Sequence, residues 1–339
     1  MKACVLHQPA PVRDRPLAYE EIERPKPPPG HLLIKVRACG VCRTDLHVVE
    51  GELDQARQKT PVIPGHQIVG EVVESREAAS GLDIGDRVGV AWLHCTCGSC
   101  RYCSTSRENL CEHAQFTGWT RDGGYAEYVV APADFVYPLP QKLDDHQVAP
   151  LLCAGIVGYR CLEQTGIVQW IGARLGMYGF GAAAHIGIQI ARSRGAEVFV
   201  CTRDRQRHQI LAEELGAAWV GDTFDRPPVK LDAAIIYAPA GEIVPAALEA
   251  LDRGGCLVLG GIHMSPIPSL QYRDLYWERV IRSVANNTRA DGRAFLEEAA
   301  RVGVKTHVET FPLPQANDAL IALKHDAIKG AAVLVVEES

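Results

Sequence analysis

The sequence lacks the long hydrophobic runs that export or membrane insertion requires. Its N-terminal segment, which begins Met1-Lys2, contains no apolar core of about 7 to 15 residues. No uncharged stretch of about 18 residues occurs later in the 339-residue chain. We therefore expect neither secretion nor a membrane partner, and a cytoplasmic location.

The sequence also lacks an excess of basic residues, low-complexity tracts and internal repeats. It has 35 Lys and Arg against 41 Asp and Glu, a net charge of −6, and its arginines are scattered along the chain. This distribution gives no electrostatic footprint for nucleic acid, so a small molecule is the expected partner. With 47% apolar and 22% charged residues, the composition is that of a folded globular protein.

The length and the cysteine content are informative. A chain of 339 residues exceeds the usual size of one core, which predicts two domains. Twelve cysteines are present. In a reducing compartment, clustered thiols more often bind metal or carry out chemistry than form disulfides, so their spacing decides between these roles.

The chain has two regions with different sequence patterns. Up to about residue 111, short apolar runs at 31–38, 68–74 and 86–90 are broken by Pro and Gly, which indicates a β-rich region. After Asp144, which has helix N-cap character, a long apolar segment at 148–162 predicts a helix. Alternating strand and helix signals follow, so the second half is predicted to be α/β.

The α/β half begins with a strand at 174–178, a glycine turn, and a helix up to residue 195. Repeated strand and helix units predict a doubly wound parallel sheet of the Rossmann type. A terminal strand at 331–336 could return to the first region, which would make that domain discontinuous. Further elements are expected as strands at 198–201, 233–237, 256–259 and 280–284 and as a helix at 205–215.

Four cysteines follow the pattern C-x2-C-x2-C-x7-C, namely Cys97, Cys100, Cys103 and Cys111. Gly98 permits the turn that directs two thiolates at one point. Four thiolates complete a tetrahedral zinc site and leave no position for substrate, so this site is predicted to be structural. The alternative is four free thiols or two disulfides. Cys95 breaks the regular spacing and is left out.

Cys42, His66 and Cys153 are separated along the chain, and each alone is typical of a buried thiol or a core histidine. Together with other motifs, however, the chain resembles the zinc-containing medium-chain alcohol dehydrogenase family over nearly its whole length. The matching motifs are Gly40-Val41-Cys42-Arg43-Thr44-Asp45, Pro64-Gly65-His66, the four-cysteine cluster, Gly123-Gly124-Tyr125-Ala126-Glu127-Tyr128, Leu151-Leu152-Cys153-Ala154-Gly155 and the turn at Gly179.

The resemblance implies a GroES-like, zinc-binding catalytic domain over 1–154 and 288–339, and a Rossmann cofactor domain over 155–287. It also implies that Cys42, His66 and Cys153 hold a catalytic zinc whose fourth position is left to water or the substrate oxygen. With the cysteine cluster, the expectation is two zinc ions per chain.

Around the catalytic zinc, the resemblance implies a proton relay that includes Thr44 and His47. Asp45 would accept the other N–H of the ligand His66, and Arg43 would meet the cofactor pyrophosphate. Two positions depart from the family. Gln67 stands where the family often has Glu, and Val157 where it often has Thr. The lost negative charge suggests a more electrophilic metal.

The turn Gly179-Phe180-Gly181-Ala182-Ala183-Ala184 fits G-x-G-x-x-G/A. In that motif Gly179 makes the turn, Gly181 admits the pyrophosphate, and Ala184 allows close helix packing. About 20 residues later, Thr202 stands where an NAD enzyme usually has Asp or Glu, and Arg203 follows it. A hydroxyl and a guanidinium suit a 2′-phosphate, which favours NADP, although Asp204 keeps NAD possible.

The predicted function is reversible hydride transfer between a primary or secondary alcohol and NADP or NAD. Trp92 and Trp119 resemble residues that line the family's substrate cleft, although either fits an ordinary core, and an uncharged small alcohol or aldehyde is expected. The resemblance also implies a homodimer or homotetramer. Two alternatives stay open: a zinc-free NADPH reductase of quinones or activated alkenes on the same fold, and a non-catalytic cofactor-binding redox sensor.

Overall fold

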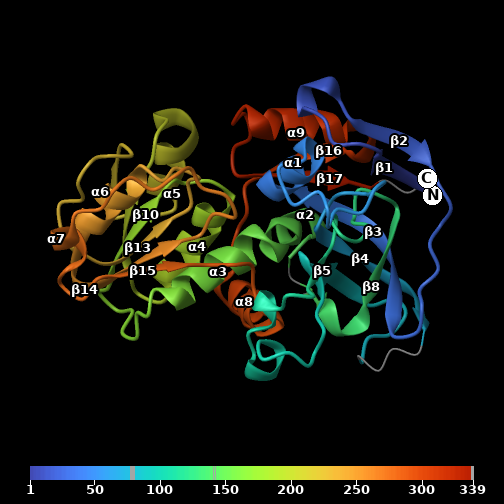
Figure 1. Cartoon of the computed structure of the whole chain (residues 1–339), viewed down its shortest axis with the longest axis horizontal. Helices are drawn as coiled ribbons and strands as arrows, with labels where there is room; N and C mark the ends of the chain where they lie inside the picture. Colours follow the sequence, from blue (N-terminus) through green and yellow to red (C-terminus); the bar gives the residue numbers. More distant parts are fainter. Residues whose placement is uncertain (77–80, 140, 142, 337–339) are drawn as a thin grey trace. The chain divides into compact units, whose positions relative to one another are not determined.

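The computed structural model describes residues 1–76, 81–139, 141 and 143–336. The chain forms two compact units (Figure 1). The first comprises Met1–Cys153, Thr288–Glu297 and Thr306–Ser339, and the second comprises Ala154–Asn287 and Glu298–Lys305. The ranges expected from the sequence assign 298–305 to the first domain, whereas these residues group with the second unit.

The first unit is built on a seven-stranded sheet. Its strands follow the order β16-β17-β3-β4-β5-β9, and β8 also pairs with β3. β17 runs antiparallel to β3, so the C-terminal strand does return to the first region. Two-stranded sheets are formed by β1 with β2 and by β6 with β7. The strands are β1 (Lys2–Leu6), β2 (Leu17–Glu21), β3 (His31–Val41), β4 (Gln67–Arg76), β5 (Arg87–Val90), β6 (Leu93–Cys95), β7 (Gln115–Phe116), β8 (Tyr128–Pro132), β9 (Val136–Pro138), β16 (Val308–Pro312) and β17 (Ala331–Val335).

The helices of this unit are short. Asp144 caps α2 by accepting a 2.8 Å hydrogen bond from the amide of Gln147, as its N-cap character predicts. The single helix expected at 148–162 is wrong. Pro150 opens a 3₁₀ turn, and the backbone breaks at Cys153 before the next helix starts. The helices are α1 (Arg43–Glu50), α2 (Asp145–Val148), α9 (Ala316–Lys324) and α8 (Arg289–Val302), which spans the division between the units.

The second unit is a parallel six-stranded sheet in the order β12-β11-β10-β13-β14-β15. Numbered along the chain, this is the 3-2-1-4-5-6 order of doubly wound dinucleotide-binding folds, which confirms the predicted fold class. Its strands are β10 (Arg174–Tyr178), β11 (Glu197–Cys201), β12 (Trp219–Gly221), β13 (Leu231–Ile236), β14 (Leu251–Leu259) and β15 (Val280–Ser283).

Helices connect β10 to β11, β11 to β12, β13 to β14 and β14 to β15, because a parallel pair needs a crossover, and α3 precedes β10. The helix expected at 205–215 forms in two parts, a π-helical turn at Arg205–Gln209 and then α5. The helices are α3 (Ala154–Gln164), α4 (Ala182–Ser193), α5 (Ile210–Glu214), α6 (Ile243–Ala250) and α7 (Tyr272–Leu275). Buried aliphatic and aromatic side chains of β10, β11, β13, β14 and α6 form one core.

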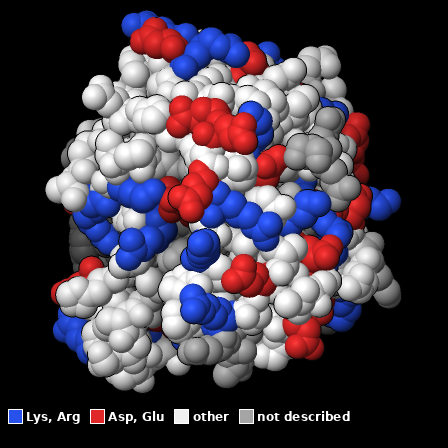
Figure 2. Space-filling view, turned by 90° about the vertical axis from the view of Figure 1, so that its right-hand side faces the viewer, with Lys and Arg blue, Asp and Glu red and all other residues white. Residues whose placement is uncertain are grey.

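Among the described residues, no helix combines the length and the apolar character that crossing a membrane requires. On the face shown in Figure 2, basic and acidic side chains are interspersed. Neither sign of charge is gathered into one continuous area of that face.

Candidate functional site

The first turn of α1 positions Cys42. The Cys42 Sγ accepts a hydrogen bond from the Thr44 amide at 3.3 Å, and the Cys42 amide donates to Asp45 Oδ2 at 2.9 Å. These bonds form a capping box, so the thiol stands at the positive end of the helix. This position stabilises a thiolate, the form in which cysteine binds metal.

Asp45 also orients His66. The imidazole is fully buried, and its Nδ1 lies 2.9 Å from Asp45 Oδ1. Its other nitrogen, Nε2, lies 3.2 Å from Cys42 Sγ. Because the carboxylate accepts the Nδ1 proton, Nε2 is the nitrogen that faces the thiol and that would bind a metal once it is deprotonated. The sequence-based expectation for Asp45 matches this contact.

The break before α3 brings a third donor to the same place. The Sγ atoms of Cys42 and Cys153 and a ring nitrogen of His66 all lie within 4.8 Å of one another. The contact with Cys153, with burial next, raises the pKa of Cys42 well above its ordinary value. Burial lowers the pKa of His66, but Asp45 and Cys42 outweigh it and raise that pKa to about 10. Without a cation these effects outweigh that of the helix N-terminus, so the group retains protons. A divalent cation would replace the protons and relieve the repulsion between two buried thiolates.

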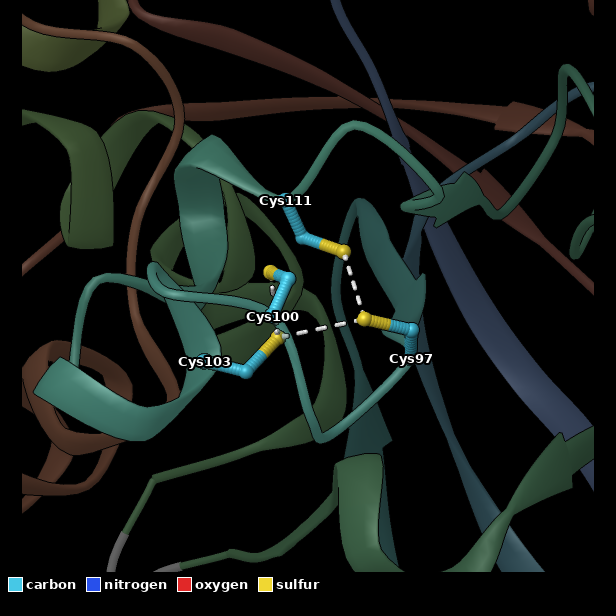
Figure 3. A group of neighbouring side chains, drawn as sticks. All are labelled: Cys97, Cys100, Cys103 and Cys111. Carbon is cyan, nitrogen blue, oxygen red and sulfur yellow. Dashed lines mark hydrogen bonds between the residues drawn. The ribbon is translucent and has the colours of Figure 1, made fainter.

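The second cluster lies on the loop between β6 and β7, where the four thiols turn toward one another (Figure 3). Their sulfurs are 3.9 Å apart for Cys97 and Cys103, 3.5 Å for Cys100 and Cys103, and 3.6 Å for Cys97 and Cys111. Tetrahedral zinc with Zn–S bonds of about 2.3 Å requires sulfurs about 3.8 Å apart. A disulfide requires about 2.0 Å. The spacing therefore fits a metal site.

The turn at Gly98 favours the thiolate form of Cys97. Gly98 has a φ of +73°, the conformation that the sequence predicts for the turn. The backbone N–H groups of Ser99 and Cys100 bond to the Cys97 sulfur and lower its pKa to about 6. The cluster packs on a small core of its own. A metal would be the principal cross-link of this segment.

The two predicted relay residues lie one turn apart on α1. Thr44 is buried, and among the described residues its hydroxyl has no hydrogen-bond partner. The His47 imidazole pairs through Nδ1 with the Glu52 carboxylate. Glu52 was not anticipated from the sequence, because it lies beyond the helix that carries the motif. Arg43 is exposed at the same end of α1.

Beside His66 lies a stack of three aromatic rings. Trp92 meets the His66 ring edge to face, with centroids 4.8 Å apart, and it stacks on Trp119 at 5.9 Å. Phe116 completes the stack 5.2 Å from Trp92. The Arg57 guanidinium covers Phe116 and Trp119. Phe116 and Arg57 could not be singled out from the sequence, because only the fold brings them to Trp92 and Trp119.

Gln67 is buried at the start of β4 and packs on Gly40, where an added Cβ would lie 2.9 Å from the Gln67 side chain. The Gln67 side chain therefore lies against Gly40, which precedes Cys42 by two residues in the sequence. Val157 is half-buried on α3.

The glycine turn lies in the second unit, between β10 and α4. Gly179 has a φ of +85°, and a Cβ there would lie 3.0 Å from the Ala238 amide nitrogen. Gly181 is the N-cap of α4; a Cβ on it would meet nothing within 4 Å, and none of the described side chains caps the helix. Ala184 is fully buried. This leaves helix N–H groups open to an anion such as a pyrophosphate.

The residues at the end of β11 are also defined. Thr202 is buried, and Arg203 is exposed beside it. Asp204 accepts hydrogen bonds from the amides of Gln206 and Arg207 at 3.1 and 3.0 Å, and its carboxylate lies 3.7 Å from the Arg207 guanidinium. Asp204 is thus engaged in capping the helical turn that follows.

The chain matches the alcohol dehydrogenase GroES-like domain over residues 28–141. It is 51% identical to the probable alcohol dehydrogenase AdhA of Mycobacterium tuberculosis, over 99% of this chain and 97% of that one. A cinnamyl alcohol dehydrogenase of Sorghum bicolor has a similar structure, with 26% identity, a TM-score of 0.89, and coverage of 100% of this chain and 99% of that one.

A third match is a putative zinc-binding dehydrogenase of Sinorhizobium meliloti, solved with NADP, with 26% identity, a TM-score of 0.86 and coverage of 98% of both chains. The matches to the three dehydrogenases extend over both units. The chain belongs to the medium-chain alcohol dehydrogenase family and is an oxidoreductase of that family.

Proposed function

We propose that this alcohol dehydrogenase depends on zinc and transfers hydride reversibly between a small uncharged primary or secondary alcohol and NADP, giving an aldehyde or ketone. The observation that carries the zinc proposal is the convergence of Cys42, His66 and Cys153 within 4.8 Å. Metal content by mass spectrometry should give two zinc ions per chain, and reduced cofactor should form from an alcohol. A protein that is active without zinc would contradict the proposal.

Zinc bound at this site would supply a Lewis acid that polarises the substrate oxygen and lowers the pKa of the alcohol. The protein's own residues do the rest. Asp45 holds His66 in the tautomer that binds metal, and Thr44 and His47 pass the substrate proton toward solvent. Glu52 orients the His47 ring. The four-cysteine cluster would hold the second zinc as a structural cross-link.

In the second unit, the glycine turn and the N-terminus of α4 would bind the pyrophosphate. Thr202 and Arg203 would receive the 2′-phosphate of NADP. Because Asp204 is engaged with its own helical turn and with Arg207, it is less available to bind ribose hydroxyls as an NAD enzyme's acid does. The similar dehydrogenase solved with NADP supports the same preference.

Replacing Arg203 by alanine should lower kcat/KM for NADP by about 10- to 100-fold, because a charge-assisted hydrogen bond is lost. The value for NAD should change little. The matched control is Arg205→Ala, since Arg205 is a nearby exposed arginine already paired with Glu213. A wild-type protein with higher kcat/KM for NAD than for NADP would refute the preference.

The aromatic stack suggests the shape of the substrate. Trp92 contacts the ring of the proposed ligand His66, and Trp119 stacks on Trp92. Both tryptophans are packed in the hydrophobic core of the first unit. A substrate that met the edge of this stack beside His66 would meet a flat aromatic surface, which favours small or planar alcohols. The similar cinnamyl alcohol dehydrogenase supports aromatic alcohols as the first candidates.

Gln67→Glu should move the pH profile of alcohol oxidation upward by about one unit. The added carboxylate is buried next to the proposed zinc ligand His66. Its negative charge raises the pKa of the group that must lose a proton, so half-maximal kcat requires a higher pH. Gln67→Met, which is neutral and of similar size, is the control. A profile identical to that of the wild type would rule out an electronic role for Gln67.

A homodimer or homotetramer formed through the second unit is also part of the proposal. β15 lies at one edge of its sheet. Tyr272, Tyr276 and Trp277 are 74%, 57% and 44% exposed near it in sequence, and Val280 on the strand is exposed as well. An apolar surface at an open sheet edge suits a second copy of the chain. The clustered thiols also suit a reducing, cytoplasmic compartment.

A further inference from the structure

Asp45 is a buried carboxylate with three hydrogen bonds. Only 1% of its side chain is exposed, and it accepts from the Cys42 amide, the Gly65 amide and His66 Nδ1. A carboxylate has about four acceptor positions. Among the described residues no fourth donor is bonded to it. One acceptor position of the carboxylate that orients His66 is therefore open.

Tyr125 has a buried hydroxyl donor that lacks an acceptor. Its side chain is fully buried, and its hydroxyl has no hydrogen-bond partner among the described residues. Burial, with the charge of Asp45 next, raises the pKa of this phenol well above its ordinary value, so it stays protonated and is a donor. A buried hydroxyl without a partner destabilises the folded state, and phenylalanine would fill the same space without that penalty.

The Tyr125 segment also holds the loop that carries His66. The amides of Gly124 and Tyr125 donate to the carbonyls of Gly65 and Pro64 at 2.9 and 3.0 Å. The tyrosine ring lies so close to Gly65 that a Cβ on this glycine would be 2.4 Å from the ring. The tyrosine ring is therefore held against Gly65, whose amide donates to the Asp45 carboxylate, and the charge of that carboxylate acts on the phenol.

We propose that Tyr125 is a positioning residue whose hydroxyl donates the fourth hydrogen bond to Asp45 and thereby fixes His66 as a metal ligand. The inference rests on the proposed zinc function. The bond would satisfy the open acceptor position of Asp45 and the unpartnered Tyr125 hydroxyl at once. It holds the carboxylate, which in turn keeps the Nε2 lone pair of His66 directed at the metal position.

The test is Tyr125→Phe in the full chain loaded with zinc. Release of the zinc held by Cys42, His66 and Cys153 to a chelator should be at least about 10-fold faster than in the wild type. The reason is that hydrogen-bond partners of metal ligands contribute about 10- to 100-fold to metal affinity. The visible spectrum of the cobalt-substituted protein should shift as the ligand field changes. The matched control is Tyr237→Phe, since Tyr237 lies in the second unit and also has a buried hydroxyl without a partner among the described residues.

A merely structural tyrosine predicts a different result. Tyr125→Phe would then alter the melting temperature while zinc release and the cobalt spectrum stayed as in the wild type, and this outcome would overturn the proposal. A second measurement uses the wild-type protein and therefore does not depend on whether the variant folds. In the wild type, the Tyr125 hydroxyl proton should exchange slowly with solvent and resonate downfield, whereas rapid exchange would overturn the proposal. A wild type that binds only one zinc would refute the proposed function instead, and the hydroxyl proton would still test the bond to Asp45.

Discussion

Replacing Cys153 by serine should lower kcat/KM for alcohol oxidation about a thousandfold or more and reduce the zinc content from two ions per chain to one. The reason is the chemistry of the donor set. Cys153 supplies one of two thiolates, and a hydroxyl is a poor zinc ligand at neutral pH. A Lewis acid at the reacting oxygen contributes several kcal/mol, and each 1.36 kcal/mol corresponds to about tenfold in rate.

The control for this variant is Cys161→Ser. Cys161 lies on α3, the helix that begins directly after Cys153, and it is a buried free thiol outside both clusters. It should retain two zinc ions per chain and nearly full kcat/KM. If Cys153→Ser retained both zinc ions and its activity, Cys153 would not be a ligand.

Replacing Cys100 by serine should remove the other zinc and lower the stability of the first unit by several kcal/mol. In small zinc peptides, structural zinc contributes about 10–16 kcal/mol of binding free energy. A loop that also packs on an apolar core keeps part of its stability without zinc, so the expected loss here is smaller. Here that core is small, since Leu93, Ala114 and Phe135 form most of it with Cys111. Thermal unfolding and metal content are the measurements.

Cys95→Ser is the control for Cys100→Ser. Cys95 packs beside the cluster, and its sulfur bonds to the Gln115 side chain at 3.4 Å instead of facing the other thiols. Two zinc ions and an unchanged melting temperature are expected. Equal losses in the Cys95 and Cys100 variants would show that the segment depends on packing alone and that no metal cross-links it.

Local signals in the sequence predicted much of the fold. The strand expected at 174–178 is β10, the Asp144 cap is formed, and the terminal strand pairs with β3. These features depend on neighbouring residues, on hydrophobic periodicity and on turn chemistry, which a sequence displays directly. The helix expected at 148–162 failed at Cys153 because apolar periodicity continues through a break that Pro150 and the local packing impose.

The parts of the site that the sequence could not indicate are contacts through space. Tyr125 belongs to a recognised motif, yet nothing in its spacing shows that its hydroxyl lies beside Asp45. Phe116 reaches Trp92 because β7 pairs with β6, and Arg57, from a loop outside both strands, covers Phe116 and Trp119. For Asp204, the sequence position left ribose binding open, whereas the structure shows that its carboxylate caps the following helical turn.

The measurement that tests the central claim most directly is zinc X-ray absorption of the Cys100→Ser variant, which should retain only the proposed catalytic ion. Cys42, His66 and Cys153 predict two sulfur ligands at about 2.3 Å and two lighter ligands at about 2.0–2.1 Å. Four sulfur ligands, or a protein without bound zinc that still oxidises alcohols, would contradict the account.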